Sequence, residues 1–216
     1  MQKYKIVIVD YGVGNLLSVQ RAVKECGSDA IVSSDPKAIS KASRVILPGV
    51  GAFSNGMKAL KMLGLVDTLK NLAKDGIPLL GICLGMQLLL DQSEEYGFTN
   101  GLGIMPGRVI PIPKKSIEGY PLKIPHIGWN KLYPHRNTSW ENTFLDKIKP
   151  SDTTYFVHSY MAIPSESDKI LANCIYGGNH IPAVICNGNV LGCQFHPEKS
   201  GVVGLSLLKT FLDTVK

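Results

Sequence analysis

The sequence predicts an α/β protein with a doubly wound, mostly parallel sheet and an antiparallel extension. Apolar strands alternate with amphipathic helices over roughly the first hundred residues, which is the strand–helix order of a doubly wound fold. These strands are apolar throughout rather than alternating, as in a parallel sheet that helices cover on both faces. Beyond that point prolines and turn residues interrupt the chain, and short strands replace the helices.

The first half is expected to hold four strands and four helices. Branched aliphatic runs predict the strands, and apolar residues at helical spacing predict the helices. The expected strands are residues 3–10, 30–32, 43–47 and 77–82, and Pro48-Gly49 ends the third. The expected helices are residues 15–26, 54–63, 65–75 and 84–92, and Gly27 terminates the first.

The second half is expected to hold six short strands and a closing helix. The strands are residues 108–112, 131–133, 154–157, 170–174, 183–186 and 190–194. Asn187-Gly188 signals a hairpin between the last two strands, and an apolar helical pattern covers residues 201–215. No internal repeat, linker or low-complexity tract divides the sequence, so residues 1–216 are expected to form one domain.

Composition narrows the class of protein. Of the 216 residues, 44% are hydrophobic and 19% are charged, which is ordinary for a globular protein and excludes a disordered or coiled-coil chain. The longest nearly apolar stretch, residues 77–90, is interrupted by proline, glycine and glutamine and is too short for a membrane span. The N-terminal apolar run is too short for a signal peptide and has no small-residue cleavage site.

Charge and cysteine content point to a cytoplasmic protein without a metal or cofactor. The net charge of +6 is spread along the chain, and its densest group, Lys114, Lys115 and Lys123, lacks interleaved aromatic residues. This pattern disfavours nucleic acid and favours a solvated surface or an acidic protein partner. The five cysteines are odd in number and form no CxxC pair, which indicates a reducing compartment without a disulfide or zinc framework.

The most informative segment is Gly81-Ile82-Cys83-Leu84-Gly85, between a buried strand and an amphipathic helix. The glycines permit a tight, strained turn that projects the cysteine at the carboxyl end of the strand, as in a nucleophile elbow. The helix N-terminus favours the thiolate, and the N–H of Leu84 is placed to receive an oxyanion. The alternative is a buried structural cysteine, the usual fate of a free thiol. The strand–turn–helix context favours the nucleophile.

A second candidate segment, Phe195-His196-Pro197-Glu198, follows an expected strand. His196 and Glu198 are two residues apart and can leave the same face of that strand. Glu198 would then orient His196, and His196 would take the thiol proton. A surface turn with unrelated charges explains the segment equally well in isolation, but the upstream elbow favours the catalytic interpretation.

The segment Pro48-Gly49-Val50-Gly51 also ends a strand. Its glycines permit a backbone flip that presents N–H groups to an anion. An ordinary turn is an equally good explanation when this segment is taken alone.

Together these three segments resemble the triad (class I) glutamine amidotransferases, through PGVG at 48–51, GICLGMQ at 81–87 and FHPE at 195–198. Within that family, further strings are similar to the glutaminase subunits of imidazole glycerol phosphate synthases: DYGVGN at 10–15, PHIGWN at 125–130, FVHSY at 156–160 and HPEKS at 196–200. The resemblance runs along the whole chain. It implies a flavodoxin-like domain that hydrolyses glutamine to glutamate and ammonia.

The resemblance also implies the roles of individual residues. Cys83 would be the nucleophile, His196 the base and Glu198 its orienting carboxylate. The N–H of Leu84 and a flipped peptide at Val50–Gly51 would form the oxyanion hole. The residues implied to hold glutamine are Gly49, Gln87, Glu95, Ser159 and Tyr160.

Elementary chemistry supports these implied roles unevenly. Gln87 lies one helical turn after Cys83 and can face the same pocket. Glu95 suits a substrate α-amino group by its charge, but the neighbouring Glu94 is equally acidic. His158 follows an apolar strand, and a structural histidine is the favoured interpretation over a second base.

The partner implied by the resemblance is a (β/α)8-barrel cyclase in a heterodimer. It would accept ammonia through its interior and join it to a phosphorylated ribulosyl nucleotide intermediate, giving imidazole glycerol phosphate and aminoimidazole carboxamide ribotide. The implied contact residues are Tyr11, Asn15, Trp129 and Lys199. Plainer roles are a helix N-cap for Asn15, a packed hairpin corner for Trp129 and solvated surface for Lys199.

Three other functions remain open from the sequence. A similar glutaminase could feed ammonia to a sugar-amidating enzyme of surface polysaccharide synthesis. A stand-alone cysteine hydrolase would need no partner and should lack the PHIGWN and HPEKS strings. A non-catalytic binding module is disfavoured because Cys83, His196 and Glu198 are all present.

Overall fold

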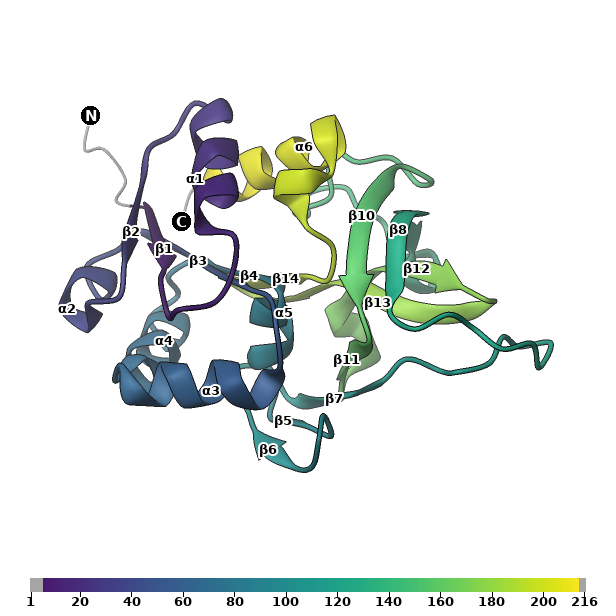
Figure 1. Ribbon diagram of the computed structural model, residues 1–216. Coiled ribbons are helices and arrows are strands. Elements are labelled where there is room, and N and C mark those ends of the chain that lie inside the picture. Colours follow the sequence, from purple (N-terminus) through teal and green to yellow (C-terminus); the bar gives the residue numbers. More distant parts are fainter. Residues whose placement is uncertain (1–5, 214–216) are drawn as a thin grey trace.

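The computed structural model describes residues 6–213, and an eight-stranded mixed sheet forms its centre (Figure 1). The strand order is β2-β1-β3-β4-β14-β13-β12-β9. The first five strands are parallel: β2 (Ala30–Ser33), β1 (Ile6–Val9), β3 (Arg44–Gly49), β4 (Leu79–Cys83) and β14 (Val190–Cys193). The antiparallel remainder is β13 (Asn179–Asn187), β12 (Ile170–Tyr176) and β9 (Tyr133–Pro134). The sheet confirms the predicted fold class.

Helices cover both faces of the parallel part of the sheet (Figure 1). On one side lie α1 (Leu16–Glu25) and α6 (Gly201–Asp213), and on the other lie α3 (Phe53–Met62), α4 (Leu65–Lys74) and the short α5 (Leu84–Leu88). A further short helix, α2 (Pro36–Ile39), precedes β3. None of the described helices is long and apolar enough to cross a membrane.

Two smaller sheets flank the antiparallel end. One pairs β10 (Thr153–His158) with β8 (His126–Lys131), and the other has the order β11-β7-β5-β6. The strands of the second are β11 (Tyr160–Pro164), β7 (Gly107–Pro111), β5 (Gln92–Ser93) and β6 (Thr99–Asn100). Three 3-10 turns complete the described elements: η1 (His135–Asn137), η2 (Ser167–Lys169) and η3 (Pro197–Lys199).

The hydrophobic core has two parts, one on each face of the large sheet. Successive side chains of a strand point to opposite faces, so Ile6 and Ile8 pack with α1 and α6 while Val7 and Val9 pack with α3 and α4. All four side chains are buried. This double burial explains why the parallel strands are apolar at every position.

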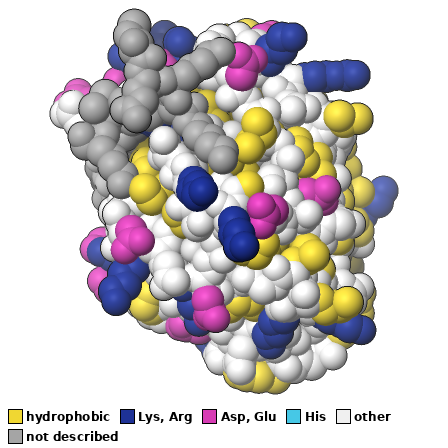
Figure 2. All heavy atoms as spheres, turned by 90° about the vertical axis from the view of Figure 1, so that its left-hand side faces the viewer, with side chains coloured by type: hydrophobic (Ala, Val, Ile, Leu, Met, Phe, Trp, Pro, Cys, Tyr) yellow, Lys and Arg dark blue, Asp and Glu magenta, His cyan; other side chains and the backbone are white. Residues whose placement is uncertain are grey.

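On the surface, charges of both signs intermingle. Figure 2 shows basic, acidic and hydrophobic side chains interspersed on the face that includes the β2 edge of the sheet. The view agrees with the expectation of a dispersed charge.

Most predicted ranges contain the element expected there, although α2, β5, β6 and β11 were not predicted. Four differences in the predicted elements have identifiable causes. The helix expected to reach residue 92 ends at Leu88, because the N–H groups of Leu102 and Ile104 bind the carbonyls of Leu88 and Leu89. β3 continues through Pro48-Gly49, which was expected to end it, because Gly49 still pairs with Cys83.

The other two differences concern the second half. The strand expected at residues 131–133 is divided between β8 and β9, because β8 pairs with β10 whereas β9 pairs with β12 in the large sheet. Most of β8 was not predicted. The hairpin loop lies one residue later than predicted, at Gly188-Asn189, because Asn187 pairs with Val190. The expected termini at residues 3–5 and 214–215 lie outside the described residues.

One close contact fixes α6 against the turn that precedes it. A Cβ atom on Gly204 would lie 2.0 Å from the carbonyl oxygen of Pro197. Gly204→Ala is therefore expected to lower the free energy of unfolding by about 1–3 kcal/mol, since the clash is with backbone. Urea denaturation measures this change.

Gly56→Ala in α3 is the matched control. A Cβ atom there would meet only Leu84 and Leu88 side chains, at 3.2 Å or more, and alanine raises helix propensity by about 1 kcal/mol. Equal destabilisation by the two substitutions would contradict the proposed contact.

Candidate active site

Cys83 occupies a strained turn between β4 and α5. Its backbone has φ 54° and ψ −110°, a conformation that costs a non-glycine residue about 1–3 kcal/mol. A Cβ atom on Gly85 would lie 1.7 Å from the carbonyl oxygen of Leu47, and one on Gly81 would lie 2.7 Å from the backbone of Gly85. Both glycines are therefore required by backbone packing, and the predicted elbow geometry is present.

Strand register brings the separate motifs to this turn. β4 lies between β3 and β14, with Gly49 opposite Cys83 and Cys193 opposite Ile82. Gln194 therefore follows at the level of Cys83, and His196 lies two residues further on. Neighbouring parallel strands thus assemble the site from segments that are far apart in the sequence.

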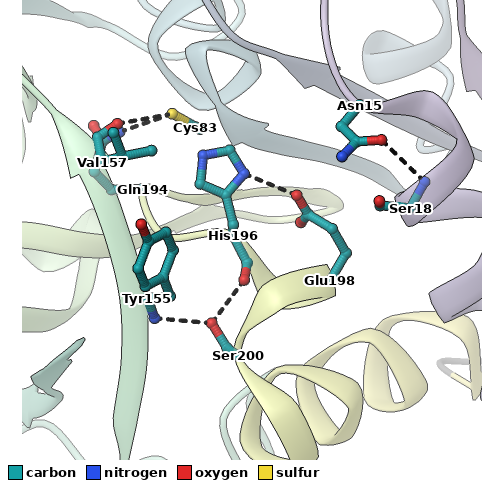
Figure 3. Close-up of polar contacts among 9 residues, drawn as sticks. All are labelled: Asn15, Ser18, Cys83, Tyr155, Val157, Gln194, His196, Glu198 and Ser200. Atoms are coloured by element: carbon teal, nitrogen blue, oxygen red, sulfur yellow. Dashed lines mark hydrogen bonds and ion pairs between the residues drawn. The ribbon is translucent and has the colours of Figure 1, made fainter. Parts of the chain in front are cut away.

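His196 lies between Cys83 and Glu198 (Figure 3). Its Nδ1 is 2.9 Å from Oε1 of Glu198, and both side chains are at most 3% exposed. The other ring nitrogen, Nε2, is buried without a hydrogen-bond partner and lies on the side of the ring that faces Cys83. The expected pairing of His196 with Glu198 is therefore present, with Nε2 left for the thiol.

Opposing effects act on the charge of His196. Burial alone would lower the pKa of His196, but the adjacent Cys83 and Glu198 outweigh burial and raise the pKa above its ordinary value. The environment of His196 therefore favours its protonated form, the imidazolium.

Ser200 fixes the backbone of His196, a role that sequence reasoning missed. Its hydroxyl donates to the carbonyl oxygen of His196 at 2.6 Å and accepts from the N–H of Tyr155 at 3.0 Å (Figure 3). The N–H of His196 donates in turn to the carbonyl oxygen of Tyr155. Ser200 lies within the HPEKS string, which was the available sequence signal.

A pocket opens beside Cys83 and collects most of the residues expected to bind glutamine. Its lining comprises Val50, Gly51, Cys83, Leu84, Gln87, Glu95, Pro125, Val157, His158, Ser159 and Tyr160. Gly49 is the expected residue that does not line the pocket. Pro125, Val157 and His158 line it without having been expected to.

Two polar side chains of the pocket are held in place by backbone groups. Nε2 of Gln87 donates to the carbonyl oxygen of Tyr160 at 3.1 Å, and Glu95 accepts the N–H of Phe53 at the start of α3. Glu95 is buried, whereas Glu94 lies at the surface 3.9 Å from Arg108. The structure thus separates two carboxylates that the sequence left equivalent.

His158 is part of a buried polar chain rather than a second base. Its Nδ1 donates to the carbonyl oxygen of Tyr160 at 2.9 Å, and its Nε2 is 3.0 Å from Nδ1 of His126. Because a carbonyl oxygen only accepts, Nδ1 of His158 carries the proton and Nε2 accepts from His126. Burial lowers the pKa of His158 to about 3, so the ring stays neutral. This arrangement agrees with the expectation of a structural histidine.

The four residues expected to contact a partner divide into two groups. Asn15 caps α1 by accepting the N–H of Ser18 at 3.3 Å, and it is exposed, as is Lys199 in η3. Trp129 is 58% exposed and packs edge-on against Tyr155. These three side chains are accessible to another protein.

Tyr11 was expected to contact the partner, but the structure contradicts this expectation because its side chain is only 2% exposed. A Cβ atom on Gly49 would lie 2.2 Å from its hydroxyl oxygen, so the ring is enclosed beneath Gly49 and cannot form a docking surface. Burial also raises the pKa of Tyr11. Its role is to pack under the strand that leads to Val50 and Gly51.

Solved structures share this fold. The chain superimposes on PurLQS from Thermotoga maritima with a TM-score of 0.72, 18% identity and full coverage of both chains. It superimposes on the glutaminase domain of CTPS from Trypanosoma brucei with a TM-score of 0.64 and 17% identity, covering 99% of this chain and 95% of that one. Identities this low establish the fold alone.

Sequence relatives are much closer. The family model "Glutamine amidotransferase class-I" matches residues 7–215. Imidazole glycerol phosphate synthase subunit HisH 1 of Legionella pneumophila (strain Lens) is 49% identical, over 96% of this chain and 98% of its own length. The HisH subunit of Geobacillus thermodenitrificans is 46% identical, over 97% and 96%. The chain therefore belongs to the class-I glutamine amidotransferases, in the family of imidazole glycerol phosphate synthase subunit HisH.

Proposed function

We propose that this chain is the glutaminase subunit of a cytoplasmic imidazole glycerol phosphate synthase. It hydrolyses glutamine to glutamate and ammonia, and it delivers the ammonia to a (β/α)8-barrel cyclase subunit that performs the lyase reaction of histidine biosynthesis. The observation that carries this proposal is the elbow cysteine beside the buried His196–Glu198 pair, at the wall of a pocket lined by Gln87 and Glu95. The identity to HisH relatives supports the choice of pathway.

Glutamine hydrolysis follows from this arrangement in two stages. The Cys83 thiolate attacks the side-chain amide carbon, and the N–H groups of Leu84 and of the Val50–Gly51 segment receive the oxyanion. The His196 imidazolium gives its Nε2 proton to the leaving nitrogen, so ammonia departs and a thioester remains. Water then attacks the thioester, its proton passes to His196, and glutamate leaves. Glu198 keeps the imidazole oriented through both stages.

Residues that line the pocket account for its specificity for glutamine. Glu95 provides a negative charge for the α-ammonium group. Gln87 and the backbone of Ser159 and Tyr160 lie at the wall of the pocket and provide hydrogen-bonding groups for the rest of the glutamine molecule. Burial of Glu95 strengthens its attraction for a cation.

The proposed docking surface comprises the exposed residues Asn15, Trp129 and Lys199. Co-purification of a (β/α)8-barrel with the chain, followed by steady turnover of the ribulosyl nucleotide, tests the proposal directly. Turnover of a sugar acceptor in place of the nucleotide would overturn the histidine-pathway assignment and leave the glutaminase assignment intact.

The isolated chain is expected to hydrolyse glutamine about a hundredfold more slowly than the complex with its acceptor bound. The oxyanion N–H must flip into place in a segment where Gly51 has φ 118° and Val50 is 43% exposed. If the competent conformation is populated at roughly one per cent, the rate of glutamine hydrolysis falls by about this factor. Steady-state glutamate release measures both rates. A fully active isolated chain would contradict the flip.

Cys83→Ala is expected to abolish glutamine-dependent synthesis, with a loss of about a millionfold as for other triad nucleophiles. Synthesis from ammonium salt at about pH 8.5 should survive, because free ammonia reaches the acceptor without Cys83. Product formation is measured with each nitrogen source on wild-type and mutant complexes. If the mutant complex kept its glutamine-dependent activity, Cys83 would not be the nucleophile. If an assembled mutant complex lost both activities, the role of Cys83 would be structural.

Lys199→Ala is expected to weaken partner binding by about 2 kcal/mol if Lys199 meets an acidic side chain that becomes buried. Titration calorimetry with the partner measures the affinity. The matched control is Lys74→Ala, an exposed lysine that precedes β4 and therefore lies at the opposite end of the sheet. Equal affinity of the Lys199 variant and the wild type would exclude Lys199 from the interface.

A further inference from the structure

We propose that Gln194 is a positioning residue that favours the thiolate form of Cys83 by donating its side-chain N–H to the sulfur atom. The inference rests on the proposed role of Cys83 as the nucleophile. It concerns a residue between β14 and His196 that the sequence analysis did not single out.

The sheet places Gln194 beside the nucleophile. Cys193 is opposite Ile82 in the parallel pair β14–β4, so the next residues of the two strands are Gln194 and Cys83. Gln194 is fully buried, and its Nε2 is 3.7 Å from Sγ of Cys83, within hydrogen-bond distance for sulfur (Figure 3). Its backbone N–H donates to the carbonyl oxygen of Ala183, which anchors the residue to β13.

A chain of hydrogen bonds determines which end of the Gln194 amide faces the sulfur. The carbonyl oxygen of Tyr160 can only accept, so the group of Gln87 that contacts it at 3.1 Å is the NH2 group. The same NH2 group lies 3.0 Å from Gln194 and donates to its Oε1. The remaining end of Gln194, the NH2 group, is therefore the end that faces Cys83.

This donor has its greatest effect when Cys83 is ionised. As a thiol, Cys83 donates its proton to the carbonyl oxygen of Val157 at 3.8 Å. Once the proton moves to His196, that carbonyl oxygen faces a negative sulfur and repels it. The N–H of Gln194 then offers the thiolate a hydrogen bond, and bonds to ionised acceptors are about twice as strong as neutral ones.

If the role of Gln194 were only structural, its side chain would fill space and accept the hydrogen bond from Gln87. The two roles differ in what they do to the protonation of Cys83. A space-filling role leaves the pH dependence of thiol reactivity unchanged, whereas loss of the donor moves this dependence to higher pH.

The test is the rate at which iodoacetamide alkylates Cys83 in the full chain as a function of pH. Gln194→Met keeps the length of the side chain and removes the donor. Gln194→Asn keeps a buried amide but withdraws it by one methylene, so it supplies a second variant if the first does not fold. Asn189→Ala is the control, because the Asn189 amide donates to the carbonyl oxygens of Ala73 and Ile77, away from Cys83.

Alkylation must be assigned to Cys83 by its position in the chain, because Cys26 and Cys186 are partly exposed and can react as well. Burial raises the pKa of both thiols, that of Cys186 to about 11, so they react slowly near neutral pH. Mass spectrometry of the modified peptide, with Cys83→Ala as the blank, identifies the site.

Both Gln194 variants are expected to alkylate about tenfold more slowly at neutral pH, with the midpoint of the pH–rate profile about one unit higher. Asn189→Ala should match the wild type. An unchanged midpoint in a folded Gln194 variant would overturn the proposal.

Glutamine hydrolysis by the wild-type complex is measured in parallel, which separates this proposal from the proposed function. An active wild type with unshifted Gln194 variants refutes the role of Gln194 alone. An inactive wild type refutes the glutaminase assignment, and with it the catalytic meaning of any shift at Cys83.

Discussion

Close backbone contacts on both sides hold the turn at Cys83. The backbone of Cys83 has a positive φ, a conformation that is unfavourable for a residue with a side chain. Gly85 touches the carbonyl oxygen of Leu47 on β3, and Gly81 touches Gly85 across the turn. The buried strands β3 and β14 enclose β4, so the strained conformation cannot relax without opening the sheet. The same enclosure sets Gly49, Cys83 and Gln194 at one level and brings His196 to the sulfur. Local strain and long-range assembly are therefore maintained by one set of packed strands.

Near Cys83, buried polar side chains form hydrogen-bond chains of defined direction. His126 donates to His158, and both His158 and Gln87 donate to the carbonyl oxygen of Tyr160. Because this oxygen only accepts, it fixes a histidine tautomer on one side and an amide orientation on the other. Buried polar groups that are satisfied in this way are rigid, since any rotation leaves a donor or acceptor unpaired. The wall of the pocket thus has a fixed pattern of donors and acceptors before substrate arrives.

Short sequence motifs predicted the parts of the site whose geometry depends on neighbouring residues in the chain. The elbow and the His196–Glu198 pair were predictable because glycine spacing and a two-residue separation fix their geometry. The end of α5 was not, because distant N–H groups bind its last carbonyls. Gln194 was overlooked because its proximity to Cys83 depends on β14 lying next to β4, and strand order cannot be read from apolar runs. Tyr11 was misplaced for a similar reason: only the folded structure brings it beneath Gly49.

The central position of β14 has a consequence for biosynthesis of the protein. A ribosome releases β1, β2, β3 and β4 early, yet the strand that covers the free edge of β4 is β14, the last strand among the described residues. Until it emerges, the nascent chain exposes an apolar strand edge, which is a template for pairing with other chains. Chaperone demand during translation should therefore be concentrated in the interval between synthesis of β4 and release of β14. A truncated product that stops before β14 would retain Cys83 but lack His196 and Glu198, and it would also be prone to aggregate.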